Sequence, residues 1–426
     1  MNQEPKFLIG ASIPRSGHNF LATLLRNLFG SAMHYCEFYR PKDCCRQIPC
    51  ALRGNFSYIF QKNHEHNWEV PKGIAEAVYI IQYRHPVPEA LSHLELGLTV
   101  DANSENSEYA RTREYYALRL AKKAIYYRRF HDKWLVDPVP NCVYLDYDRL
   151  AAAPADAVAE VVRAVGATVK PGRIEKIVAA RGSVRMGSGK QGRTSFRPRV
   201  IEESPYFDAD LLGAFEDYVI TMTPRFGYQR MLAGKYEGHL IQGLILALDE
   251  TVAVPNGQDR LLAAMALTGE HPEVMVRLAE RELGAGKSRA AIDRLERVVT
   301  QHPTCPRPYM PLLIAYRQQH RLPPASFFGS DSLFALARQP AILAQAAKLF
   351  LEQGRTAHGM AALSVALSFN PENAEAHKMA AGLMETGNVT RALAHAEEAL
   401  RRHPEDATAA ALASIIRLRL ASNSQQ

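Results

Sequence analysis

The stretch from Lys6 to Asn27 restricts the fold more than any other part of the chain. A β-favouring apolar run over 6–13 is followed by a polar turn over 15–19 and then by leucines at helical spacing. This order predicts a strand, a tight turn and a helix. Such a turn offers an anion the unpaired N–H groups and positive dipole of a helix N-terminus. Gly17 allows a close backbone approach and Arg15 adds donors, so we predict a phosphate-binding turn; the alternative is an ordinary turn with an exposed arginine.

A second predicted strand, over 57–61, ends in polar residues. Lys62 and His64 follow it, two positions apart, so they point to the same side of an extended chain. In an open parallel sheet they would lie at the same edge as the first turn. A neutral imidazole can take a proton near neutral pH, and an ammonium stabilises negative charge, so His64 is the candidate base and Lys62 its partner. Glu65 and His66 are competing candidates, and a solvated loop is the alternative.

A third predicted strand, over 78–83, is almost wholly β-branched, apolar or aromatic, as in a buried parallel strand. Arg84 closes this strand. Pro86 and Pro88 suit the first turn of a following helix, in which Ser92 lies about two turns along. We therefore expect Arg84 and Ser92 to face one phosphate together.

These motifs, in this order and spacing, resemble the sulfotransferases that use 3′-phosphoadenosine 5′-phosphosulfate (PAPS), over residues up to about 228. The resemblance implies an α/β fold with a P-loop-like parallel sheet, and sulfuryl transfer to a hydroxyl or amine without a metal. It implies that the first turn holds the 5′-phosphosulfate, that Arg84 and Ser92 hold the 3′-phosphate, and that Phe20 stacks on adenine. The implied catalytic residues are His64, Lys62 and Arg15. The implied PAPS-binding residues are Arg15, Ser16, Gly17, His18, Asn19, Phe20, Arg84, Ser92, Lys190, Gly192 and Arg193.

Two features depart from that family's pattern. His18 and Asn19 stand where many members have two threonines, which adds a titrating group beside the 5′-phosphate. The late segment 187–193 keeps two glycines but has Gly187 and Ser188 where Arg and Lys are expected. Charge from Lys190, Arg193 and Arg185 would replace them at the 3′-phosphate; the alternative is a solvated basic loop.

From about residue 236 strand-like runs vanish and amphipathic helices alternate with turns. Three helix-ending prolines, Pro303, Pro371 and Pro404, are separated by 68 and 33 residues, which indicates a repeat of about 34. Small and apolar positions recur in the same register, and the segment 260–420 resembles tetratricopeptide repeats, with the unit at 306–339 distorted by extra prolines. Gly284 to Ser288 imitates half a nucleotide-binding loop, but a helix precedes it, so we predict a turn between repeat helices. The predicted organisation is a sulfotransferase domain over 1–235, a helical linker over 236–260 and an all-α repeat domain over 261–422.

Composition limits the partners. The chain has 426 residues, 47% of them hydrophobic, and a net charge of +7, which suits anionic ligands. Its basic residues are dispersed rather than gathered in a stripe with aromatics, so we expect no nucleic-acid binding. No run is long enough to span a membrane and the N-terminus has no leader pattern, so we expect a cytoplasmic protein.

Four of the six cysteines cluster in the sequence, at Cys36, Cys44, Cys45 and Cys50. Their spacing is not the paired C-x2-C pattern of structural zinc sites. The sequence leaves a metal site, a local disulfide and unligated thiols as alternatives.

Several functions compete for the whole chain. The leading hypothesis is a PAPS-dependent sulfotransferase acting on a glycan, a glycolipid, a peptide tyrosine or a small alcohol, with repeats that recruit the acceptor or a protein partner. A scaffold that binds nucleotide without catalysis is a second hypothesis. A nucleotide kinase is a third, but the first turn lacks the Gly-Lys-Ser/Thr that binds phosphate and metal.

Overall fold

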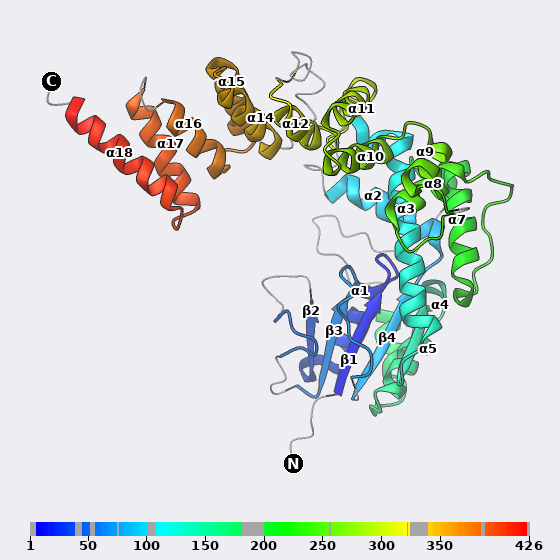
Figure 1. The fold of residues 1–426 in the computed structure, drawn as a ribbon. Helices are drawn as coiled ribbons and strands as arrows, with labels where there is room; N and C mark the ends of the chain where they lie inside the picture. Colours follow the sequence, from blue (N-terminus) through cyan, green and yellow to red (C-terminus); the bar gives the residue numbers. More distant parts are fainter. Residues whose placement is uncertain are drawn as a thin grey trace. The chain divides into compact units, whose positions relative to one another are not determined.

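The computed structural model describes residues 6–38, 45–51, 56–74, 76–100, 108–180, 200–254, 257–321, 323, 340–384 and 388–423. Figure 1 shows the elements along the chain. The chain divides into two compact units. The first comprises Met1–Val100 and Arg119–Ile241, and the second comprises Asp101–Leu118 and Gln242–Gln426.

The first unit is built on a five-stranded parallel sheet with the order β2-β3-β1-β4-β5. The strands are β1 Lys6–Ser12, β2 Met33–Glu37, β3 Tyr58–Asn63, β4 Ala77–Tyr83 and β5 Cys142–Asp146. The connection from β1 leads to one side of the sheet and that from β4 to the other. The loops after these two neighbouring strands therefore flank a topological switch point, where open α/β sheets bind ligands.

Helices connect and cover the strands of this unit. They are α1 His18–Phe29, α2 Pro86–Val100, the part of α3 Arg113–His131 from Arg119 onward, α4 Tyr147–Ala152, α5 Pro154–Ala164, α6 Arg173–Ala179 and α7 Ala209–Met222. On one face, alternate strand residues such as Leu8 and Ile80 pack against α1 and α5 in a single buried cluster. On the other face, Tyr79 contacts Trp134, with ring centroids 5.6 Å apart. Because both faces of the sheet are covered, the sequences of its central strands are nearly continuous apolar runs.

Helices are the only regular secondary structure among the described residues of the second unit. Its helices are α8 His239–Leu248, α9 Arg260–Thr268, α10 Pro272–Gly284, α11 Ser288–Gln301, α12 Tyr309–Gln318, α14 Pro340–Glu352, α15 Thr356–Phe369, α16 Ala374–Met384, α17 Val389–Arg402 and α18 Ala407–Asn423. The two helices pack against each other in three pairs, α10 with α11, α14 with α15 and α16 with α17. Their first helices begin at residues 272, 340 and 374, which is the spacing that the prolines predicted.

Small residues allow the two helices of a pair to approach closely. Ala347 is fully buried, and a Cβ added to Gly359 of α15 would lie 2.6 Å from the side chain of Leu351 in α14. Ala380 and Ala392 are buried at the matching positions of α16 and α17. The prediction of repeated, closely packed helix pairs is confirmed for these three pairs.

The secondary-structure predictions are confirmed at the elements that position the site. Strands occur at the three predicted runs, and the turn at 284–288 joins α10 to α11. The short strand β2, with polar His34 and Glu37, was not predicted, because only two of its five residues are buried and its pattern is weak. Among the described residues, none of the helices has the length and hydropathy needed to cross a membrane.

Candidate functional site

The turn after β1 has the backbone conformation that the sequence predicted for a close approach. Gly17, at the N-cap of α1, has φ 79°, and Arg15 also has a positive φ of 66°. A Cβ at Gly17 would lie 3.1 Å from the side chains of Tyr147 and Leu150. Arg15 and Asn19 are exposed, whereas Ser16 is fully buried. The turn therefore presents Arg15 and the first turn of α1 to solvent.

The residues predicted to hold phosphate come together around this turn. The Nε of Arg15 donates to Ser92 Oγ on α2 at 3.0 Å, and Arg84 Nη1 donates to the carbonyl oxygen of Arg15 at 3.3 Å. The guanidinium of Arg84 lies 4.0 Å from the centre of the Tyr147 ring, a cation–π contact. Two guanidinium groups and a hydroxyl from three separate segments thus share one cluster.

Lys62 joins the end of β3 to the start of α1. Its Nζ donates to Asn19 Oδ1 at 2.8 Å and lies 2.9 Å from Glu37 Oε1 on β2. Lys62 is only 4% exposed, and a buried ammonium requires such partners. The ion pair with Glu37 holds the ammonium beside Asn19 in the first turn of α1.

His64 is tied to β1 through Ser12. Ser12 Oγ lies 2.9 Å from His64 Nδ1 and 2.7 Å from His18 Nδ1, and His64 Nδ1 also lies 3.4 Å from the Ser12 carbonyl oxygen. Because a carbonyl oxygen only accepts, both contacts with Ser12 are satisfied when His64 carries its proton on Nδ1. The Ser12 hydroxyl then accepts from His64 and donates to His18. This tautomer leaves Nε2 of His64 with its lone pair, as a general base requires.

Burial keeps the imidazole of His64 neutral. Burial first, and then the positive charges of Lys62 and His66, lower the pKa of His64 to about 3. Burial also lowers the pKa of His18 well below its ordinary value, with further lowering by His64 and Lys62. The Tyr126 hydroxyl donates to the carbonyl oxygen of His64 and anchors the backbone at that point.

The two competing bases have different surroundings. Glu65 is fully buried, and its carboxylate lies 2.9 and 3.0 Å from Lys133 Nζ. Burial raises the pKa of Glu65 to about 7, although Lys133 opposes that shift. His66 is exposed, and its ring centroid lies 5.7 Å from that of His64. Glu65 is therefore buried against Lys133, while His66 faces solvent beside His64.

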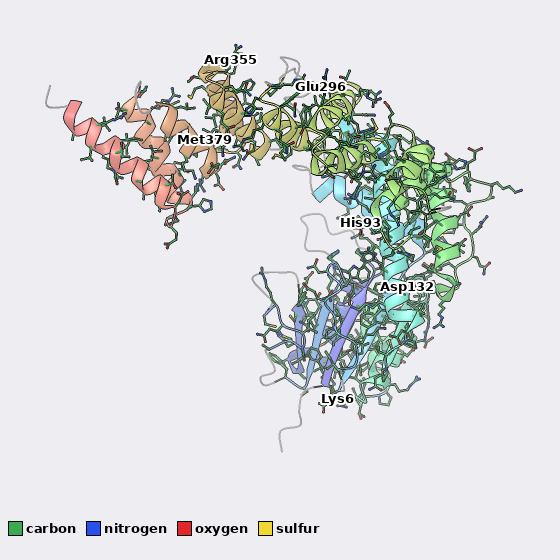
Figure 2. All side chains as sticks on the ribbon, viewed as in Figure 1. Lys6, His93, Asp132, Glu296, Arg355 and Met379 are labelled. Atoms are coloured by element: carbon green, nitrogen blue, oxygen red, sulfur yellow. The ribbon has the colours of Figure 1, made fainter. Side chains whose placement is uncertain are left out.

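A pocket of about 220 Å³ opens next to His66 and Tyr126. Its wall is strongly basic, and His93, labelled in Figure 2, lies on α2 at its side. Lys123 lies in the same wall, 2.9 Å from the buried carboxylate of Glu89 and 3.3 Å from His93 Nδ1. Burial, followed by Lys123 and Arg119, lowers the pKa of His93 to about 3. The residues lining the pocket are Pro14, His66, Ala90, His93, Leu94, Arg119, Leu120, Lys122, Lys123 and Tyr126.

Some predicted site residues lie elsewhere. Phe20 is 3% exposed and packs in the core between α1 and the sheet, so its ring has no open face for adenine. His18 points inward and stacks on Phe60, with centroids 5.3 Å apart. The apolar spacing of α1 accounts for the burial of Phe20, and we assign it no contact with adenine. Lys190, Gly192 and Arg193 lie outside the residues that the structure describes.

Three contributors to the site were not singled out from sequence. They are Ser12 at the end of β1, Tyr126 on α3 and Tyr147 at the start of α4. Only the approach of β1 to the segment after β3, and of α4 to the loop after β4, gives them roles. The position of Ser12 at a strand end beside the turn was the one available signal.

No family model matches the chain, and no curated protein matches it. Solved structures with some similarity include a thermophilic TPR protein of Thermus thermophilus, with 24% identity and a TM-score of 0.24, covering 39% of this chain and 92% of that one. They also include mouse sulfotransferase SULT7A1 complexed with PAP, with 13% identity and a TM-score of 0.35, covering 52% of this chain and 84% of that one. These likenesses are remote, so function is argued below from the site's own geometry.

Proposed function

We propose that the first unit binds PAPS and transfers its sulfuryl group to a hydroxyl or amine acceptor. The observation that carries the proposal is the convergence of Arg15, Arg84, Ser92, Lys62 and His64 at one sheet edge. Arg15 and Arg84 touch through backbone and side chain, and Lys62 reaches the first turn of α1. A donor with two anionic ends matches a cluster whose guanidinium and ammonium groups lie at or just after the ends of three strands and whose hydroxyl comes from α2.

In this proposal the first helical turn and Arg15 hold the 5′-phosphosulfate, and Arg84 and Ser92 hold the 3′-phosphate. The hydrogen bond between Arg15 and Ser92 is exchanged for bonds to the donor when it binds. The ring of Tyr147 packs against the guanidinium of Arg84 and orients it. This contact uses none of the N–H donors of Arg84. The late segment with Lys190, Gly192 and Arg193 completes the 3′-phosphate site.

The chemical step balances without a further reactant. Nε2 of His64 takes the proton of the acceptor hydroxyl as its oxygen bonds to sulfur. The bond from sulfur to the 5′-phosphate oxygen breaks, and adenosine 3′,5′-bisphosphate leaves with the electron pair. Arg15 and Lys62 stabilise the charge that develops on the leaving oxygen, because sulfuryl transfer, like phosphoryl transfer, depends mainly on positioning and neutralisation. This step requires no metal.

The pocket beside His66 is the proposed place for the acceptor. His64 is partly exposed, and Tyr126 both lines the pocket and contacts the His64 backbone. The cationic wall formed with Arg119, Lys122 and Lys123 favours an acceptor that already carries negative charge, such as an acidic glycan or peptide.

For the second unit we propose tetratricopeptide-like repeats that bind a protein partner or the acceptor. The support is the repeated start of the helix pairs at 34-residue spacing and the small residues between their helices. Repeat arrays of this kind present extended surfaces for binding.

Calorimetric titration of the full chain with adenosine 3′,5′-bisphosphate tests the binding part. We expect binding that weakens about 10- to 100-fold in Arg84→Met and in Arg15→Met, since each change removes a charge-assisted bond. Arg163→Met is the matched control, because Arg163 is exposed on α5, and its affinity should not change. Tight binding of magnesium-ATP in place of the bisphosphate would favour a kinase.

Transfer from sulfur-labelled PAPS to an acceptor panel and cell extract tests the chemistry. We expect His64→Ala to lower turnover about 10²- to 10⁴-fold while bisphosphate affinity stays within a few-fold. The exposed His239 provides a control variant, His239→Ala, with unchanged turnover. Near-normal turnover in His64→Ala would refute the base and make His66→Ala the next variant. Binding without transfer by the wild-type chain would support a scaffold.

A further inference from the structure

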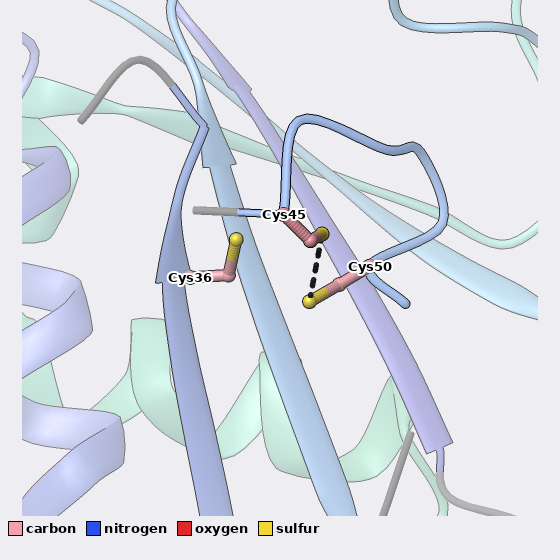
Figure 3. Close-up of side chains that lie close together, drawn as sticks. All are labelled: Cys36, Cys45 and Cys50. Carbon is pink, nitrogen blue, oxygen red and sulfur yellow. Dashed lines mark hydrogen bonds between the residues drawn. The ribbon is translucent and has the colours of Figure 1, made fainter. Parts of the chain in front are cut away.

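Three of the cysteines that cluster in the sequence, Cys36, Cys45 and Cys50, also converge in space beside β2 and β3. Figure 3 shows Cys36 on β2 facing Cys45 and Cys50 from the segment 45–51. The three sulfur atoms all lie within 4.8 Å of one another, and the sulfurs of Cys45 and Cys50 are 3.5 Å apart. Cys36 and Cys50 are fully buried, and Cys45 is partly exposed.

We propose that Cys36, Cys45 and Cys50 bind a zinc ion through three thiolates. Thiolates around one zinc ion lie about 2.3 Å from it, so tetrahedral ligands are about 3.8 Å apart. The observed sulfur spacing is already close to that value. A disulfide would use two of the thiols and leave the third without a role, whereas one soft metal ion uses all three.

Neighbouring N–H groups suit thiolates at these positions. The side-chain amide of Gln61 lies 3.8 Å from Cys36 Sγ and also donates to the carbonyl oxygen of Gln47 at 2.7 Å, which ties the segment 45–51 to β3. The backbone N–H of Ala51 donates to Cys45 Sγ at 3.2 Å. Such outer contacts orient metal ligands.

Binding converts three thiols to thiolates and releases three protons to solvent, so the zinc site carries a net charge of minus one. A water molecule at the partly exposed side of Cys45 completes four-coordination. The ion would join the segment 45–51 to β2, directly beside Glu37, which holds Lys62. The proposal does not depend on sulfuryl transfer. Cys44 lies outside the described residues and is not assigned to the site.

The test is metal analysis of the full chain, produced with added zinc and purified with a phosphine reductant and no chelator. We expect one zinc ion per chain by elemental mass spectrometry. Replacing it with cobalt should give a sulfur-to-cobalt charge-transfer band that weakens in Cys36→Ser, Cys45→Ser and Cys50→Ser. Cys142→Ser and Cys305→Ser are matched controls, because these cysteines lie outside the cluster, and both should keep the metal.

A variant that spares the ligands covers the case in which a cysteine variant fails to fold. Gln61→Leu should lower zinc affinity about 10-fold while all three thiolates remain in the cobalt spectrum. A chain without zinc or a cobalt band would overturn the proposal. A disulfide between Cys45 and Cys50 would also overturn it. This disulfide would appear as a protein mass lower by two hydrogens and as a Cys45–Cys50 cross-link in the peptide map. Metal retained at full occupancy in all three serine variants would place it elsewhere and also overturn the proposal.

Discussion

At the carboxyl edge of its sheet, the first unit buries Ser12, Lys62 and Glu65, each within hydrogen-bond distance of a named partner. The helix pairs of the second unit instead bury alanines such as Ala347 and Ala380, and many of their charges form ion pairs at the surface. The free energy of burying a polar group depends on its hydrogen-bond partner. The free energy of burying a small apolar residue depends only on how closely its neighbours pack. Substitutions should therefore change chemistry and pH response in the first unit, and packing in the second.

The largest expected effect on folding comes from breaking a buried ion pair of the first unit. Glu65→Ala leaves Lys133 without its carboxylate at a site where Glu65 is fully buried, so the free energy of unfolding should fall by about 3 kcal/mol. Urea unfolding followed by circular dichroism measures this change. Glu69→Ala removes a neighbouring exposed carboxylate and should have little effect. Equal losses in both variants would show that the burial of this pair is unimportant.

Between pH 4.5 and 7 the same residue should also give a pH dependence. The pKa of Glu65 is raised to about 7, so over this range the folded chain binds a proton that the unfolded chain has lost. The free energy of unfolding is therefore highest below pH 4.5 and falls as the pH rises to 7, by the pH-dependent part of the Glu65 contribution alone. Urea unfolding at several pH values measures this for the wild type and Glu65→Gln. The free energy of unfolding should fall less with rising pH in the variant than in the wild type. Parallel curves would contradict the assignment.

Overpacking a repeat pair should have the next largest effect. Gly359→Leu introduces a side chain where even a Cβ would lie 2.6 Å from Leu351, and should lower stability by about 1–3 kcal/mol. Gly382→Ala is the matched control, because nothing lies within 4 Å of its Cβ position on α16 and alanine favours a helix. The control should be neutral or stabilising by up to about 1 kcal/mol. Thermal unfolding distinguishes the two, and destabilisation by Gly382→Ala would contradict the packing interpretation.

Under the proposed function, removing the Ser12 hydroxyl should alter catalysis more than folding. Ser12→Ala loses one of the two contacts that hold the His64 proton on Nδ1, so kcat should fall about 3- to 10-fold with KM unchanged. His64 has a pKa near 3 and is neutral above that value, so wild-type kcat/KM should show no acid limb near pH 6.5. Ser12→Thr, which keeps a hydroxyl, should restore kcat. A change in KM without a change in kcat, or a kcat in Ser12→Thr as low as that in Ser12→Ala, would exclude a positioning role.

The smallest effect is expected at a surface ion pair of the second unit. Arg297 lies against Glu270 with both side chains substantially exposed, so Arg297→Ala should change the free energy of unfolding by no more than about 0.5 kcal/mol. Urea unfolding at low and high salt measures this. A loss as large as that in Glu65→Ala would remove the distinction between the two units.

Much of the architecture could be predicted because it depends on local patterns. The apolar run of β4, the glycine at the first turn and the spacing of Pro303, Pro371 and Pro404 each act within one or two elements. The strand β2 was missed because an edge strand with polar residues lacks a strong pattern. Phe20 was expected at a ligand, but its place in the periodicity of α1 puts it in the core.

The amino-acid sequence by itself determined the strand–turn–helix at residues 6–27, the polar residues that follow β3 and β4, and the repeat of helix pairs. These features follow from hydrophobic period, backbone preference and residue order, which are written along the chain. Only the tertiary structure decided that Ser12 lies between His18 and His64, that Tyr147 supports Arg84, and that Cys36 meets Cys45 and Cys50. Those contacts depend on the order of the strands in the sheet, and strand order is set by the packing of the whole unit rather than by any one segment.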